Sequence, residues 1–103
     1  MSSTTKAIVA KLVARQETAD EVATFLTGAL DLANAEAGTP VWFALRTDDV
    51  TFWIVDAFPG DTERQAHIDG EIAKALMANA ERLLAQPPDL GMADVLAAKV
   101  PGA

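Results

Sequence analysis

The chain has 103 residues, half of them apolar and 22% charged, so it is long enough for one globular domain, expected over residues 1–103, and too apolar for a disordered protein. Fifteen acidic and eight scattered basic residues give a net charge of −7, which argues against a nucleic-acid partner. The absence of cysteine excludes disulfides, thiolate catalysis and the common zinc sites, and it fits a reducing cytoplasm, where we expect the protein.

The first part of the chain predicts a strand followed by a helix. Residues 6–14 alternate weakly and are apolar on both sides, which is typical of a strand with both faces covered. Thr18 and Glu21 have the spacing of a capping box, in which the two side chains bond to backbone N–H groups of the first helical turn. In residues 22–33 apolar side chains recur at helical spacing, and Gly38 is expected to end the helix with a positive φ.

The strongest local prediction is a β-hairpin. Residues 41–46 and 50–58 are rich in aromatic and β-branched residues, and the polar break Thr47-Asp48-Asp49 separates them. Neither side of the two strands is polar, so we expect both faces of the sheet to be covered. The alternation leaves open which residues share a face, because a shift of one residue in the turn exchanges the two sets.

The rest of the chain predicts two helical segments and a last strand. Asp61 or Thr62 can cap a short helix that runs through Ile68, and residues 72–84 repeat at helical spacing before Pro87-Pro88. Residues 92–100 alternate and predict the last strand. The resulting order, βαββαβ, predicts a ferredoxin-like α+β domain, with a four-stranded antiparallel sheet and the helices on one face.

Helices on one face leave the other face of such a sheet uncovered. That face is also apolar by the strand patterns, and a second copy of the chain is its most economical partner. We therefore expect a homodimer whose open sheet faces pack together. No apolar stretch approaches the roughly 20 residues that span a bilayer, so no membrane partner is expected.

The order of the elements, the apolar hairpin, Asp56-Ala57-Phe58 at the end of the third strand and Ala66-His67 on the short helix together resemble the antibiotic biosynthesis monooxygenase family, a branch of the dimeric α+β barrels. The resemblance extends over residues 6–100. It implies a homodimer with an apolar pocket in each subunit, and oxidation of a quinol or aromatic polyketide by molecular oxygen without a metal or flavin cofactor. An electron-rich phenol can itself reduce oxygen once it is deprotonated, so the protein has to orient the ring, exclude water and stabilise the phenolate.

The sequence departs from that family in several places. Relatives often carry a second histidine where this chain has Ile72, tyrosine is absent, and the first strand lacks the asparagine of the related haem-degrading enzymes, which disfavours haem. The first two differences favour an alternative: a non-catalytic homodimeric module that binds a small molecule or assembles on the same fold. A third interpretation is an isomerase or decomposition enzyme that needs no oxygen.

His67, the only histidine, is the candidate catalytic residue, because its side chain alone ordinarily titrates near neutral pH and could act on a substrate hydroxyl. Its alternative is a helix histidine bonded to a backbone carbonyl or to water. The candidate substrate-binding residues are aromatic side chains that suit a flat ligand and one arginine that could hold a phenolate: Trp42, Phe43, Phe52, Phe58 and Arg46. The aromatic residues can instead belong to the core or the dimer interface, and Arg46 can pair with Asp48 or Asp49.

Two carboxylates, Asp56 and Asp94, stand in apolar strands, where an unpaired charge is costly. The favoured interpretation pairs them with Lys11, with Lys99 or with the partner subunit. If one of them instead lay unpaired in the pocket, burial would favour its protonated form and make it a candidate base.

Overall fold

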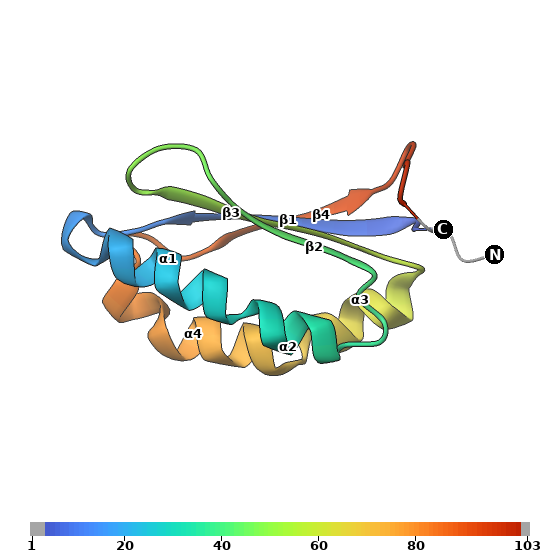
Figure 1. Ribbon diagram of the computed structural model, residues 1–103, viewed down its shortest axis with the longest axis horizontal. Helices are drawn as coiled ribbons and strands as arrows, with labels where there is room; N and C mark the ends of the chain where they lie inside the picture. Colours follow the sequence, from blue (N-terminus) through green and yellow to red (C-terminus); the bar gives the residue numbers. More distant parts are fainter. Residues whose placement is uncertain (1–3, 102–103) are drawn as a thin grey trace.

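The computed structural model describes residues 4–101, which form a four-stranded antiparallel sheet with the helices on one face (Figure 1). The ferredoxin-like α+β prediction is confirmed. The helix predicted before the hairpin is divided into two, and the two helical segments predicted after the hairpin are both present. The elements are β1 Lys6–Val13, the 3-10 turn η1 Gln16–Thr18, α1 Ala19–Gly28, α2 Leu30–Ala35, β2 Val41–Arg46, β3 Thr51–Phe58, α3 Asp61–Ile68, α4 Glu71–Leu83 and β4 Asp89–Asp94. The strand order is β2-β3-β1-β4, so β3 and β1 are central.

The register between β2 and β3 settles which hairpin residues share a face. The turn is stabilised by the Asp48 carboxylate, which accepts hydrogen bonds from the backbone N–H groups of Val50 and Thr51 at 3.0 and 2.8 Å. Trp42 then lies directly opposite Asp56, and both belong to the face that the helices cover.

The main core lies between the covered face of the sheet and helices α1 and α4. Its larger buried side chains come from the two central strands and these two helices: Leu12, Phe52, Ile54, Val22, Leu26, Leu76 and Leu83. Full burial of such a side chain contributes about 1.5–3 kcal/mol, so these contacts stabilise the packing of the helices on the sheet. None of the helices within residues 4–101 combines the length and apolar character needed to cross a membrane.

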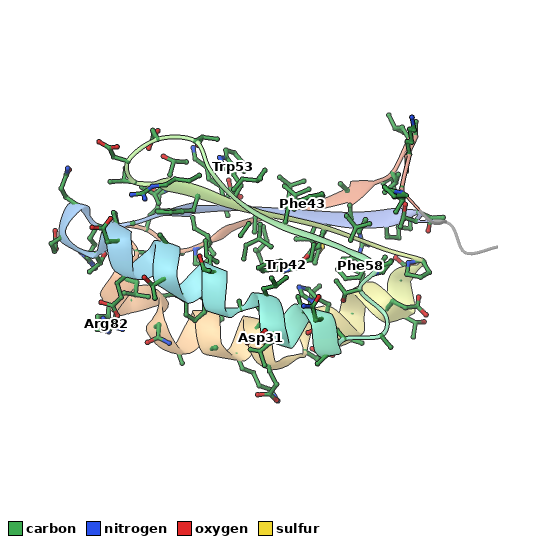
Figure 2. All side chains as sticks on the ribbon, in the orientation of Figure 1. Asp31, Trp42, Phe43, Trp53, Phe58 and Arg82 are labelled. Atoms are coloured by element: carbon green, nitrogen blue, oxygen red, sulfur yellow. The ribbon has the colours of Figure 1, made fainter. Side chains whose placement is uncertain are left out.

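The other side of the sheet, here called the open face, is apolar and has no helix over it (Figures 1 and 2). Val9, Phe43 and Leu45 on this face are 36%, 55% and 46% exposed in the single chain. Trp53 and Val55 lie between them on β3 and are half-buried. The expectation that both faces of the hairpin are apolar is therefore confirmed.

The position predicted for the last strand was wrong. β4 begins at Asp89 and ends at Asp94, and no strand continues through the predicted range to residue 100. Its partner strand explains the end point, because Asp94 lies opposite Lys6, the first residue of β1. Leu96, which the alternation placed inside the strand, is 97% exposed.

The predicted capping box was also wrong. The Thr18 hydroxyl donates to the backbone oxygen of Leu83 at 2.7 Å, and Glu21 forms an ion pair with Arg82 at 2.7 Å. The turn η1 precedes α1, so Thr18 has a φ of −114° and a ψ of 5° and lacks the extended conformation typical of a cap residue. Both side chains therefore connect α1 to the end of α4.

Gly38 does not end the helix in the predicted way. α2 ends at Ala35, and the backbone of Gly38 is not in the left-handed region. A Cβ atom at Gly38 would lie 3.2 Å from Cγ of Glu63, so the glycine allows the loop after α2 to approach α3 closely.

These assignments predict unequal costs for two leucine truncations. Leu12→Ala removes a side chain with no exposed surface and should lower the free energy of unfolding by about 2–5 kcal/mol. Leu96→Ala should change it by less than about 0.5 kcal/mol, because the side chain is exposed. Urea unfolding of both variants measures the difference. Equal losses would mean that Leu96 is packed and that the assignment of β4 is wrong.

Candidate functional site

Asp56, His67 and Glu36 form a hydrogen-bonded line with the imidazole in the middle. His67 Nε2 is 2.9 Å from Asp56 Oδ2, and His67 Nδ1 is 2.5 Å from Glu36 Oε1. The side chains of Asp56, His67 and Glu36 are 1%, 8% and 21% exposed. The line therefore runs from the interior of the protein towards its surface.

Three separate elements bring these side chains together. Asp56 belongs to the set of β3 residues that faces the helices, and His67 lies in the last turn of α3. Glu36 follows the end of α2, and its carboxylate also accepts a hydrogen bond from the Thr39 hydroxyl at 2.8 Å. A Cβ atom at Gly70 would lie 3.1 Å from Glu36 Oε2, so the glycine leaves room for this carboxylate.

The two carboxylates stabilise the protonated form of His67. Burial lowers the pKa of His67, but the hydrogen bonds and negative charges of Asp56 and Glu36 outweigh burial and raise the pKa above its ordinary value of about 6.5. An imidazolium donates from both ring nitrogens, whereas a neutral imidazole donates from only one. The cationic form therefore matches its two acceptors.

A small apolar cavity lies beside the buried end of this line, between the sheet and α4. Its volume is about 150 Å³, and its aliphatic wall includes Ile8, Ala10, Ile54, Ile72, Leu76 and Leu90. Asp56 and His67 are the residues of its wall that carry charged or ionisable side chains. Apolar walls with a few polar groups are typical of small-molecule sites.

A more open depression, here called the surface hollow, lies on the other side of His67. It has a volume of about 380 Å³ and is lined by Glu36, His67, Gly70 and neighbouring residues of α2, α3 and α4. His67 lines both spaces and therefore separates the cavity from the surface hollow. Within residues 4–101, no group of three or more His, Cys, Asp or Glu side chains is arranged to hold a metal ion.

The structure brings three of the predicted site residues to this region. His67 lines the cavity, and the Phe58 ring lies 5.2 Å from the imidazole, centroid to centroid. Trp42 lies opposite Asp56 and packs against Ile72 between the sheet and the helices (Figure 2).

The other three predicted site residues lie elsewhere. Phe43 is on the open face, on the opposite side of the sheet from the cavity. Phe52 is buried in the main core, with the Arg46 guanidinium 4.8 Å above its ring. Arg46 donates to the backbone oxygen of Asp49 at 2.8 Å, so it contacts the turn as predicted, but its carboxylate partner is Asp20, at 3.8 Å, and not Asp48 or Asp49.

The predicted lysine partners of the two strand carboxylates were wrong. Asp56 pairs with His67, and Asp94 pairs with Lys6 at 2.7 Å. The alternation in β3 already places Asp56 among buried residues, which was the available signal for a functional carboxylate. Glu36 was missed because it lies in a short polar loop, where a glutamate is usually solvated and nothing local indicates a buried partner.

We expect the pKa of His67 to exceed 6.5 in the folded protein, and an NMR titration of its Hε1 resonance is unambiguous because no other histidine is present. Asp56→Asn removes one negative partner and should lower this pKa. Glu71→Gln is the matched control, because the Glu71 carboxylate is exposed and does not contact His67. An unchanged pKa in Asp56→Asn would contradict the proposed cause.

A raised pKa in the folded state also has a consequence for stability. Protonated His67 stabilises the fold fully below its unfolded pKa of about 6.5, and this contribution is lost as the pH rises through the folded-state pKa. The difference in unfolding free energy between the wild type and His67→Gln should therefore shrink as the pH rises from about 6.5 through the folded-state pKa. Urea unfolding across this range measures the difference, and a constant value would contradict the expectation.

Solved structures are similar to this chain, whereas no protein-family model and no curated protein matches its sequence. PA3566 from Pseudomonas aeruginosa is 22% identical with a TM-score of 0.78, covering 94% of this chain and 99% of its own. A protein from Caulobacter crescentus provisionally named an antibiotic biosynthesis monooxygenase is 18% identical with a TM-score of 0.79, covering 91% and 92%. At these identities the similarity shows a shared fold.

A third solved structure is much more similar. It is the NE2512 protein of unknown function from Nitrosomonas europaea, which is 47% identical to this chain with a TM-score of 0.95. The match covers 97% of this chain and 97% of NE2512. Since this identity extends over nearly all of both sequences, the chain belongs to the same protein family as NE2512.

Proposed function

We propose that the protein is a cofactor-independent monooxygenase that oxidises a small aromatic, quinol-like molecule in the cavity beside Asp56 and His67. The observation that carries this proposal is the combination of an aliphatic cavity with a buried carboxylate–imidazole pair in its wall. The fold shared with proteins provisionally named antibiotic biosynthesis monooxygenases supports the reaction class.

The reaction requires that a phenolic hydroxyl lose its proton in a site without water. The mainly aliphatic wall of the cavity favours an aromatic ring over water. His67 lies in the same wall, and its cationic form is stabilised by two carboxylates. Its positive charge offsets part of the negative charge of a phenolate bound beside the two carboxylates.

The oxidation balances without a separate reductant. A hydroquinone and one O₂ give a hydroxyquinone and one water: one oxygen atom forms the new C–O bond, and the other leaves in the water with two hydrogens from the substrate. The substrate supplies all four electrons that the two oxygen atoms accept. The protein then has to bind the quinol, lower the energy of its deprotonated form and admit oxygen.

Oxygen uptake by the purified protein with hydroquinones in metal-free buffer tests this proposal. We expect protein-dependent uptake that falls by about 100-fold or more in His67→Ala, because the loss of one charge-stabilising group costs on this scale. Gln65→Ala, an exposed residue on the same helix, is the matched control and should leave the rate unchanged.

Two other outcomes distinguish the alternatives. If quinols raise the melting temperature but no oxygen is consumed, the protein is the non-catalytic binding module, an interpretation that the absence of tyrosine and the presence of Ile72 favour. If product forms without oxygen, the reaction is an isomerisation or decomposition.

We also propose that two copies of the chain pair through their open faces. The face is mainly apolar across three adjacent strands, with Val9, Phe43 and Leu45 at least one-third exposed. Lys11 is its basic residue, and the Lys11 ammonium lies over the Trp53 ring. Contiguous exposed apolar surface of this kind is typical of interaction sites, and self-pairing covers it with an equally apolar partner. The cavity is lined by residues of the covered face and the helices, so its wall lies outside the proposed interface.

Phe43→Glu tests this pairing. Burial of a carboxylate in place of an aromatic ring should weaken the dimer by about 3 kcal/mol or more, which is more than 100-fold in the dimer dissociation constant. Sedimentation equilibrium measures it, with Leu30→Glu as the control, because Leu30 is 47% exposed on α2 at the other side of the molecule. A wild-type protein that stays monomeric at micromolar concentration would exclude the homodimer.

A further inference from the structure

We infer that Asp56 Oδ1 is the atom that receives the hydroxyl group of the ligand, and that the ligand is a single-ring molecule with a hydrogen-bond donor. This inference rests on the proposed function, because it assumes that an aromatic molecule occupies the cavity. Asp56 then contacts the ligand hydroxyl, and His67 is a positioning residue that holds the Asp56 carboxylate in place.

The first observation is an incomplete set of hydrogen bonds at a buried carboxylate. Asp56 is 1% exposed, and its Oδ2 atom is bonded to His67. Its Oδ1 atom is buried and has no hydrogen-bond partner among the residues that the structure describes. Buried polar atoms in native proteins nearly always have a partner, so one without a partner requires an explanation.

The position of Asp56 supplies that explanation. Asp56 lines the cavity, and apart from His67 the wall is apolar, so the protein offers no donor there. A ligand that enters the cavity with an O–H group would supply the missing donor. A carboxylate can accept several hydrogen bonds, so a bond at Oδ1 leaves the bond between Oδ2 and His67 intact.

The size of the cavity limits the ring system. An apolar cavity of about 150 Å³ accommodates a molecule the size of benzene. The fused rings of an aromatic polyketide would extend beyond this volume. A single-ring phenol or hydroquinone is therefore the better fit.

The geometry also separates the roles of Asp56 and His67. Both ring nitrogens of His67 are bonded to carboxylates, so neither is free for the ligand. In the reaction, the O–H bond of the ligand breaks, a new O–H bond forms at Asp56 Oδ1, and the negative charge moves from the carboxylate to the ring oxygen. The net charge of the site is unchanged by this transfer, and His67 fixes the orientation of the carboxylate.

Phenol and toluene are the probes that test this inference, because they have similar shapes and differ in one hydroxyl group. A cavity without a partner for the hydroxyl would prefer toluene, since phenol loses its hydrogen bonds to water on binding. We expect the wild type to bind phenol at least tenfold more tightly than toluene, measured by NMR titration of the protein. In Asp56→Asn this preference should fall, because a neutral amide forms a weaker hydrogen bond with the hydroxyl than a carboxylate does.

Asp94→Asn is the matched control. The Asp94 carboxylate also belongs to the sheet, but it is paired with Lys6 and does not line the cavity. The affinities for phenol and for toluene should therefore stay unchanged in this variant. The comparison of the two probes in the wild type remains decisive even if Asp56→Asn fails to fold.

The outcomes separate this inference from the proposed function. Toluene binding as tightly as phenol, or more tightly, would overturn the role of Asp56 while leaving an aromatic site in place. Failure of both probes to bind at millimolar concentration would overturn the aromatic site itself, and the proposed function with it.

Discussion

The buried carboxylate of Asp56 is the constraint on which the rest of this structure depends. A charge in an apolar sheet face is stable only with a partner, and His67 is that partner. Removal of one member of a buried charge pair typically costs about 3–5 kcal/mol, because the other is left without compensation. Glu36 extends the interaction, so that β3, α3 and the loop after α2 are connected through one imidazole.

The two faces of the sheet present different sets of side chains. Neighbouring residues of β2 point in opposite directions, so Trp42 reaches the buried site while Phe43 reaches the open face. Chemistry on one face and assembly on the other can therefore be tested separately. The same alternation explains why the aromatic residues of the hairpin do not gather in one pocket.

The position of Ile72 in the cavity wall shows what its side chain contributes to the site. Members of the monooxygenase family that the sequence resembles often have a second histidine at this position. Here the residue is Ile72, which is 2% exposed and lies in the cavity wall. An isoleucine there makes the wall more apolar and leaves Asp56 and His67 as its ionisable groups. NE2512, which is 47% identical, is a protein of unknown function, so membership of its family does not indicate a reaction. The proposed reaction therefore depends on the side chains that line the cavity.

Local patterns were enough to predict the order of the elements and the fold, because hydrophobic periods and turn residues act over short distances in the chain. They failed for β4, whose end depends on where β1 begins, and for Thr18, whose hydroxyl has a partner at the end of α4. The sequence by itself thus determined the βαββαβ architecture, the two apolar faces and His67 as a candidate. Only the tertiary structure decided that His67 lies between Asp56 and Glu36, because partners so far apart in the chain meet through packing that no local pattern encodes.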